Sequence, residues 1–487
     1  MVGFFYYDLI FLILFTLGVV IFLYKRKKNL KREGIMYLYR TQLGIKFINY
    51  VGGRYKRTLN VLSYVIIATG YILMGLMLYL LGQIAYIYLS NPDVVRAIKI
   101  PPLIPLVPYL PSMFKIDFLP PFYFTYWIIT IAVIAVFHEF AHGIYAKLYG
   151  VKVKTTGFGF LGPFLAAFVE PDEKQMVKKS KLKQITILSA GTFTNLILAI
   201  LFFLLLSLFF VLTYAPAGAI FNTYTPGVVN ISDIQKIDGI VVTDSSNATL
   251  LEIINKNNLT DDLILGDNDS QTSLIKVVAN RNYFITVNNL KEQLEAGGSQ
   301  VALYEDLPAI NVGLIGVIVE IDGNKIKTHE DLARVLKNYE IGDRINIKTK
   351  YNNTILDYNI ILKEDPNEKG RAIMGIGVLN QNTRLIGKIS DFFNFFKKPA
   401  TYYEPRFNTN FIIFIYNLIW WLALVNISVA LMNMLPVGIF DGGRMFMLTI
   451  AGITRSEKAG QWAFKVMTYI ILGIFFLLML GWFLAIF

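Results

Sequence analysis

The sequence predicts a polytopic α-helical membrane protein with about six transmembrane helices and an inserted extracytoplasmic α/β domain. Of its 487 residues, 55% are hydrophobic and 16% are charged, and the mean hydropathy is +0.51. Soluble globular domains carry about 25% charged residues. The apolar residues are gathered in long runs, and one long polar region, residues 215–408, interrupts them. These observations favour a membrane protein that carries one large domain outside the bilayer.

Six apolar runs are long enough to cross a hydrocarbon core about 30 Å thick. They comprise residues 5–24, 60–89, 123–149, 184–213, 410–435 and 464–486. Each is expected to be a helix, because a segment inside the bilayer must satisfy its own backbone hydrogen bonds. The basic residues beside the first run, Lys25 to Lys28, follow its apolar part instead of preceding it. This run is therefore predicted to be a retained anchor and not a cleaved signal peptide.

The basic residues set the predicted orientation in the membrane. The formal net charge is +12, and Lys and Arg are concentrated after the first, third and fifth apolar runs. Such stretches are usually cytoplasmic. We therefore expect a multi-pass protein of the cell membrane whose N-terminus and residues 215–408 are extracytoplasmic. No nucleic-acid-binding motif accompanies the charge, so no nucleic-acid partner is expected. Cysteine is absent, which excludes disulfides and thiolate ligands.

The segment 157–169 is apolar and Gly-rich but too short to span the bilayer. We expect a re-entrant hairpin, because irregular backbone is tolerated at membrane depth where it packs against protein. The alternative is a surface loop that lies on the membrane.

The polar region 215–408 is predicted to be mixed α/β. Its clearest part contains, in order, a strand at 317–321, a turn at 322–324, a helix opened by Thr328 with Asp331 in a capping box, and strands at 345–349 and 355–362 joined by a turn at Asn352-Asn353. Ile237-Asp238-Gly239 repeats the pattern of Ile321-Asp322-Gly323. The region is therefore either duplicated or one domain with a long insertion. Residues 243–273 are expected to be a loop or insertion by composition.

The chain has three histidines, and two of them form the pattern His138-Glu139-Phe-Ala-His142. Residues four apart lie on one face of a helix, so both imidazoles can reach the same metal ion. Glu139 beside them is placed to take a proton from water. Burying these groups in a membrane without a partner costs several kcal/mol, which a bound metal would offset. The alternative is a polar cluster that stabilises helix packing.

A catalytic zinc site needs a third protein ligand. His329 is an unsuitable candidate because it lies in the first turn of a predicted exposed helix. The acidic residues in or near the apolar runs are the remaining candidates. Asp8 is one of them and lies near the outer end of the first apolar run. Asp441 follows Pro436 and precedes Gly442, which predicts a broken helix at membrane depth. Asp441 is therefore the predicted third ligand, and a helix cap is its alternative role.

These motifs together resemble the site-2 protease family of intramembrane metalloproteases. His138-Glu139-x-x-His142 matches its first motif, and Asn433, Pro436, Asp441 and Gly442 match its later N-x-x-P-x-x-x-x-D-G motif position for position. A third family feature, Gly-x-x-x-Asn, is matched by Gly191 and Asn195. The family often carries a PDZ-like domain, which residues 215–370 resemble. The resemblance covers about residues 123–450.

The resemblance implies roles for individual residues. His138, His142 and Asp441 would bind Zn²⁺, and Glu139 would be the general base. Asn433 would hold the scissile carbonyl or its oxyanion, with a hydrogen bond between helices as the alternative. The hairpin 157–169 would help to guide a substrate strand.

The resemblance also divides the chain into four parts. They are an N-terminal membrane anchor region with two transmembrane helices (1–122), the first half of a protease core (123–214), an extracytoplasmic PDZ-like region (215–408), and the second half of the core with a C-terminal transmembrane helix (409–487). The expected function is that of a zinc metalloendopeptidase that cuts within transmembrane segments of membrane proteins, in regulated intramembrane proteolysis. Its expected partners are such substrates, the lipid bilayer, and a peptide or protein tail at the PDZ-like domain.

Two other classes of protein fit the sequence less well. A catalytically silent scaffold with a peptide-binding PDZ-like domain would predict a degraded metal motif, yet every motif residue is present. A transporter would require inverted repeats of its spans, and the apolar runs show none.

Overall fold

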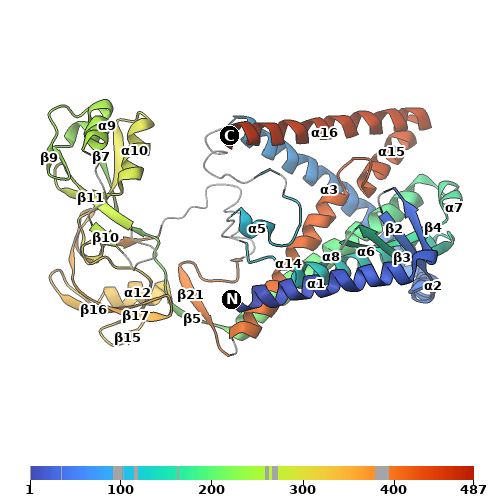
Figure 1. The fold of residues 1–487 in the computed structure, drawn as a ribbon, viewed down its shortest axis with the longest axis horizontal. Helices are drawn as coiled ribbons and strands as arrows, with labels where there is room; N and C mark the ends of the chain where they lie inside the picture. Colours follow the sequence, from blue (N-terminus) through green and yellow to red (C-terminus); the bar gives the residue numbers. More distant parts are fainter. Residues whose placement is uncertain are drawn as a thin grey trace. The chain divides into compact units, whose positions relative to one another are not determined.

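The computed structural model describes residues 2–34, 36–90, 101–102, 104–114, 119–161, 164–257, 263–265, 272–378, 394–407 and 409–486. The chain divides into two compact units, Met1–Phe210 with Asn408–Phe487, and Val211–Phe407 (Figure 1). We call them the helical unit and the β-rich unit.

Six long helices dominate the chain. They are α1 (Val2–Lys25), α3 (Lys56–Ser90), α6 (Phe124–Leu148), α8 (Lys181–Thr213), α14 (Thr409–Asn433) and α16 (Glu457–Ile486). All six are long and apolar enough to cross a membrane. These six candidate spans fit the expected polytopic membrane protein. Shorter helices lie between them, namely α2 (Ile45–Arg54), α5 (Leu110–Met113), α7 (Glu173–Val177) and α15 (Asp441–Thr454), with a 3-10 turn, η1, at Lys27–Asn29.

The helical unit also contains a four-stranded antiparallel sheet of order β1-β2-β3-β4. Its strands are β1 (Leu30–Glu33), β2 (Met36–Thr41), β3 (Val153–Leu161) and β4 (Phe164–Pro171). The expected hairpin is thus a β hairpin of β3 and β4, with its tip, 162–163, outside the described residues. A Cβ atom on Gly157 would lie 2.4 Å from the Tyr39 carbonyl oxygen, so glycine permits the close pairing of β3 with β2. The contribution of residues 30–41 was not predicted from the sequence.

Asp8 fixes the beginning of α6. Its carboxylate accepts hydrogen bonds from the backbone N–H groups of Phe124 and Thr125, both at 2.8 Å, and from the hydroxyls of Thr125 and Tyr109. The first N–H groups of a helix have no partner within the helix. No side-chain cap is present at Tyr123, so Asp8 from α1 supplies the missing acceptor. The acidic residue near the end of the first span is therefore a cap for another helix.

The β-rich unit contains two larger sheets, ordered β7-β13-β12-β11-β8-β9 and β17-β16-β14-β5-β21. Its strands are β5 (Tyr214–Ala219), β6 (Thr223–Tyr224), β7 (Pro226–Asn230), β8 (Lys236–Ile237), β9 (Ile240–Val241), β10 (Leu263–Leu265), β11 (Thr272–Val278), β12 (Asn282–Ile285), β13 (Gln300–Glu305), β14 (Val317–Ile321), β15 (Asn324–Lys325), β16 (Arg344–Tyr351), β17 (Thr354–Ile361), β18 (Lys363–Asp365), β19 (Glu368–Ile373), β20 (Ile376–Gly377) and β21 (Thr401–Pro405). Its helices are η2 (Ile231–Asp233), α9 (Asn247–Lys256), α10 (Val287–Glu295), α11 (Pro308–Asn311) and α12 (His329–Leu336).

The elements expected between 317 and 362 are confirmed. Thr328 and Asp331 form the predicted capping box of α12. The turn residues Asn352 and Asn353 have φ values of 45° and 66° and join β16 to β17. Such left-handed conformations are tolerated well by Asn.

The loop expected at 243–273 is partly wrong. Residues 247–256 form helix α9, which begins with the Ser246 side chain accepting a hydrogen bond from the Thr249 N–H. Leu250 and Ile254 of this helix are buried. The polar composition concealed a short amphipathic helix that buries two of its apolar residues. Residues 258–262 and 266–271 of the predicted loop lie outside the described part of the chain.

The same order of elements occurs twice in the β-rich unit. Two strands across an Asp-Gly turn are followed by a Ser/Thr-capped helix and an antiparallel hairpin, once as β8-β9-α9-β11-β12 and once as β14-β15-α12-β16-β17. The first series has one additional strand, β10, which precedes β11 and pairs with it. The pairing also repeats, because β11 lies between β8 and β12 as β16 lies between β14 and β17. Each copy has its own hydrophobic core. This recurrence favours a duplicated unit over one domain with an insertion.

Candidate metal centre

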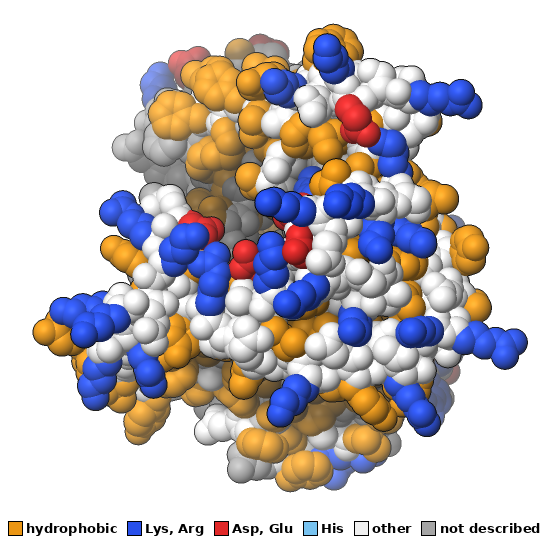
Figure 2. Space-filling view, turned by 90° about the vertical axis from the view of Figure 1, so that its right-hand side faces the viewer, with side chains coloured by type: hydrophobic (Ala, Val, Ile, Leu, Met, Phe, Trp, Pro, Cys, Tyr) orange, Lys and Arg blue, Asp and Glu red, His pale blue; other side chains and the backbone are white. Residues whose placement is uncertain are grey.

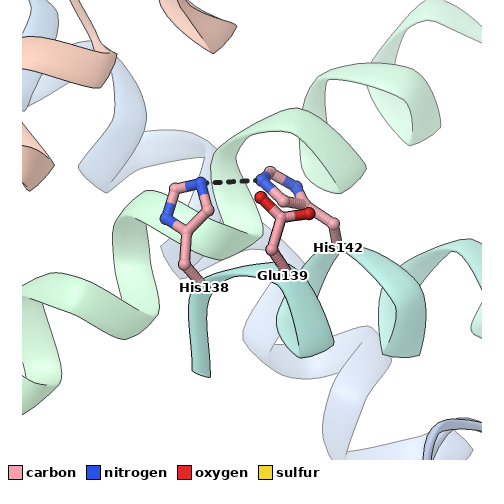
Figure 3. Close-up of side chains that lie close together, drawn as sticks. All are labelled: His138, Glu139 and His142. Carbon is pink, nitrogen blue, oxygen red and sulfur yellow. Dashed lines mark hydrogen bonds between the residues drawn. The ribbon is translucent and has the colours of Figure 1, made fainter. Parts of the chain in front are cut away.

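Two histidines and a glutamate of α6 form a cluster that could hold a metal ion. The Nε2 atoms of His138 and His142 are 3.0 Å apart, and Glu139 lies beside them (Figure 3). One ligand atom from each of the three residues lies within 4.8 Å of the others. Because the histidines are four residues apart, the helix itself places them on one face.

Asp441 joins this cluster from the other end of the chain. Its Oδ2 atom lies 3.5 Å from His138 Nε2 and 3.4 Å from His142 Nε2. Asp441 is the first residue of α15, after a break in the helix that follows Asn433. Added Cβ atoms on Gly442 and Gly443 would come within 2.3 Å of the Met434 carbonyl and 2.2 Å of the Val437 oxygen. The two glycines therefore allow the tight reversal that directs Asp441 to the histidines.

The separations of these three atoms fit a zinc ion. A tetrahedral zinc with bonds of about 2.0–2.1 Å has ligand atoms about 3.3 Å apart. The observed triangle has sides of 3.0, 3.4 and 3.5 Å. Two imidazole nitrogens and one carboxylate oxygen are also a ligand set that zinc accepts, and they leave a fourth position open.

The backbone fixes the tautomer of His142. Its Nδ1 lies 2.6 Å from the carbonyl oxygen of Ile187, which can only accept a hydrogen bond. Nδ1 must therefore carry the proton, which leaves the lone pair of Nε2 free for a metal.

Asn195 faces Nδ1 of His138, as the Ile187 carbonyl faces Nδ1 of His142. Its amide nitrogen lies 3.0 Å from His138 Nδ1, and its buried Oδ1 has no partner among the described residues. The two ends of an amide are distinguished only by their hydrogen bonds. If the Asn195 amide is rotated by 180°, its Oδ1 accepts a hydrogen bond from Nδ1–H of His138. The buried oxygen then has a partner, and the lone pair of His138 Nε2 is available for a metal. The sequence did not predict Asn195 as a site residue, although Asn195 and Gly191 match the Gly-x-x-x-Asn pattern.

Gly191 leaves room for this arrangement. A Cβ atom at this position would lie 2.5 Å from His142 Nε2 and 2.7 Å from His138 Nε2. Any side chain on this turn of α8 would therefore occupy the space between the two histidines.

Glu139 and Asn433 lie beside the ligand atoms. Glu139 Oε2 accepts a hydrogen bond of 2.9 Å from the backbone N–H of Val169 on β4. The Asn433 amide nitrogen lies 3.5 Å from His138 Nε2. His329 is exposed in the first turn of α12, and the metal-ligand cluster found among the described residues does not include it.

A cavity of about 840 Å³ opens onto the cluster. Apolar side chains of α6 and α14 line one part of it, among them Ile131, Ile134 and Val429. Glu173 and Arg444 also line it and form two hydrogen bonds of 3.0 Å with each other. An apolar cavity beside a carboxylate and a metal-ligand set can hold an apolar peptide next to a hydrolytic centre.

Two comparisons with known proteins indicate a family of metalloproteases. The sequence model of peptidase family M50 matches residues 126–478. The chain is 23% identical over 340 residues to a Clostridium perfringens protein named a candidate zinc metalloprotease, which covers 66% of this chain and 80% of that protein. It is 30% identical over 197 residues to an uncharacterized protein of Methanocaldococcus jannaschii, which covers 39% of this chain and 48% of that protein. The chain therefore belongs to peptidase family M50, the family of the site-2 proteases.

Proposed function

We propose that the protein is an intramembrane zinc metalloprotease that hydrolyses peptide bonds within transmembrane segments of other membrane proteins. One observation carries this proposal. Three ligand atoms from His138, His142 and Asp441 meet within 3.5 Å of one another, on helices that include a candidate membrane span.

The surrounding residues divide the chemistry among them. Zinc held by the two histidines and Asp441 would supply a Lewis acid that polarises a carbonyl and lowers the pKa of water. Glu139 takes the proton from the attacking water and passes it to the leaving amine. The Asn433 amide donates a hydrogen bond to the carbonyl oxygen as negative charge develops on it.

The free edge of β4 suits an extended substrate. A helical substrate hides its amides in its own hydrogen bonds, so a peptide must unwind before it can be cut. Within the described sheet β4 pairs only with β3, and its residues Leu165–Ala167 line the cavity. An unwound peptide can add to such an edge through main-chain hydrogen bonds. The hairpin thus presents the scissile bond to the metal centre.

The β-rich unit provides a second recognition surface in this proposal. A groove of about 810 Å³ lies between α12 and the segment 368–378. We assign this groove to the binding of a peptide or protein tail by a PDZ-like region. The distribution of basic residues along the chain favours an extracytoplasmic position for this region. The substrate tail would then be held outside the membrane while its span is cut.

The zinc content of the purified protein tests the proposal. The wild type is expected to hold about one zinc ion per chain. Asp441→Ala should lose it, because two histidines alone leave the ion poorly held, whereas His329→Ala should keep it. A wild type without zinc, purified gently and without chelators, would favour a catalytically silent scaffold.

The variant Glu139→Gln separates metal binding from catalysis. It should retain zinc, because Glu139 is not a ligand, yet lose cleavage of a reconstituted transmembrane substrate by about 10²–10⁴-fold. Cleavage at the wild-type rate would show that Glu139 is not the base.

A further inference from the structure

Helix α2 (Ile45–Arg54) has two faces with different surroundings. On its inner side Ile48 and Gly52 are buried. On its outer side Phe47 and Tyr50 are 53% and 60% exposed, and Leu43 just before the helix is 68% exposed. Phe47 and Tyr50 are three positions apart and share one face of α2, and Leu43 lies in the turn that leads into the helix. We call these three exposed apolar side chains, Leu43, Phe47 and Tyr50, the outer strip.

The inner face packs closely against α6. A Cβ atom on Gly143 would lie 2.9 Å from Ile48 Cδ1, and one on Gly52 would lie 2.7 Å from the Ile144 carbonyl oxygen. Gly143 and Ile144 directly follow His142 in the sequence. The helix α2 therefore supports the metal-binding turn of α6 from behind.

The outer strip is bordered by unpaired positive charge. Lys46, Arg54, Lys56 and Arg57 are all exposed, and within the described part of the chain none of them forms an ion pair. Figure 2 views the end of the helical unit where α2, α7 and α15 lie in Figure 1, and Lys and Arg side chains far outnumber acidic ones there. This surface is suited to a dense array of negative charge.

The neighbours of α2 place it at a boundary of the membrane. Only Tyr55 separates α2 from α3, which is a candidate span, and α2 contacts the last turns of α6, another candidate span. It therefore lies beside the ends of two membrane helices. Aromatic and apolar side chains bordered by Lys and Arg are typical of helices that lie in the interface between lipid and water.

We propose that α2 is an interfacial helix that binds anionic lipid. Leu43, Phe47 and Tyr50 lie at the boundary between headgroups and acyl chains, and the four flanking cations contact lipid phosphates. The strip would otherwise expose three large apolar side chains to water. This inference depends on membrane insertion and not on proteolysis, so the two can fail separately.

The natural absence of cysteine makes a depth measurement clean. A nitroxide on Tyr50→Cys is compared, in vesicles of phosphatidylcholine and phosphatidylglycerol, with labels at Asn49→Cys, Tyr64→Cys and His329→Cys. Tyr64 is 79% exposed on α3 within a candidate span, and His329 is an exposed residue of the β-rich unit. Asn49 is the matched control, since it is exposed on α2 but lies off the strip.

The label at Tyr50 is expected to collide with oxygen more than with a water-soluble nickel chelate, as the Tyr64 label does. The Asn49 label should favour the nickel chelate. A Tyr50 label that behaves like the His329 label would place the strip in water and overturn the proposal. Spin–spin broadening that disappears when more lipid is added would show that a second copy covers the strip, and would overturn it as well.

Charge reversal tests the lipid phosphates. In Lys46→Glu/Arg54→Glu the association of spin-labelled phosphatidylglycerol, relative to phosphatidylcholine, should fall by about fivefold or more. The matched control is Lys325→Glu/Lys337→Glu, which makes the same change of charge at two exposed lysines of the β-rich unit. An equal lipid preference in both double variants would show that α2 does not bind anionic lipid.

Discussion

Gly191 leaves little space beside the two histidines of the candidate metal centre. Gly191→Ala would place a methyl group 2.5 Å from His142 Nε2, so either the imidazoles or α8 must move. We expect zinc affinity to fall by about 10–100-fold, as for other disturbed ligand supports, when it is measured by competition with a chelator. Gly75→Ala on α3 is the control, because nothing lies within 4 Å of its added methyl group. Unchanged zinc affinity in Gly191→Ala would contradict the proposed ligand set.

Asn195 tests the support of His138 more selectively. Asn195→Leu removes the group facing His138 Nδ1, and zinc affinity should fall by about 10–100-fold. Asn195→Asp should preserve binding, because a carboxylate also accepts from Nδ1–H. A leucine variant that binds zinc like the wild type would show that Asn195 does not orient the ligand.

The residues of the site differ in how readily they can be predicted from the sequence. His138, Glu139 and His142 are recognisable because one helix imposes their spacing, and Asp441 because Pro and Gly mark a broken helix. The contact between Asn195 and His138 joins two helices, and no periodicity within either helix encodes it. Val169 contributes only its backbone N–H to Glu139, a contact that the identity of its side chain does not reveal.

At the scale of elements, Asp8 makes a prediction about how α1 and α6 are joined. Asp8→Ala leaves two N–H groups at the start of α6 without their acceptor. Each unsatisfied buried donor costs about 1–3 kcal/mol. The variant should unfold at a lower temperature in detergent than Asp233→Ala, a matched change at an exposed position of the β-rich unit. Equal unfolding temperatures would mean that water replaces the carboxylate without cost.

The capping box of α12 predicts a pH dependence. Burial would raise the pKa of Asp331, but hydrogen bonds from Thr328 and the Lys327 backbone outweigh it and hold this pKa below its usual value. Because the pKa of Asp331 is lower in the folded state, its ionised carboxylate stabilises the helix at pH values above the unfolded-state pKa of about 3.9. This stabilisation is lost as the pH falls through the folded-state pKa. Hydrogen exchange at the amides of α12 should therefore show protection that falls with acid. In Asp331→Asn this fall should be absent.

The elements were predicted best where local chemistry decides them. Long apolar runs and a Thr-x-x-Asp cap act within a few turns, so α3 or α12 could be placed from sequence. The sheet of β1 to β4 could not, because it joins residues 30–41 to 153–171 across two membrane spans. Its pairing depends on how α1, α2 and α6 pack.

At the scale of the whole molecule, the distribution of charge predicts a sidedness. In intact cells His329→Cys should react with a membrane-impermeant maleimide, and Lys178→Cys, in a basic stretch, should react only after lysis. Both positions are exposed, so accessibility within the fold does not limit the labelling. Labelling with the opposite sidedness would invert the proposed topology.

The separation of the proposed metal ligands along the chain has a consequence for biosynthesis. The whole β-rich unit lies between His142 and Asp441. A ribosome that adds about 5–20 residues per second needs about 15–60 s to pass from one to the other. During that interval α6 already exists, but no nascent chain holds a complete ligand set. The order of synthesis therefore delays completion of the proposed metal site until Asp441 has been made.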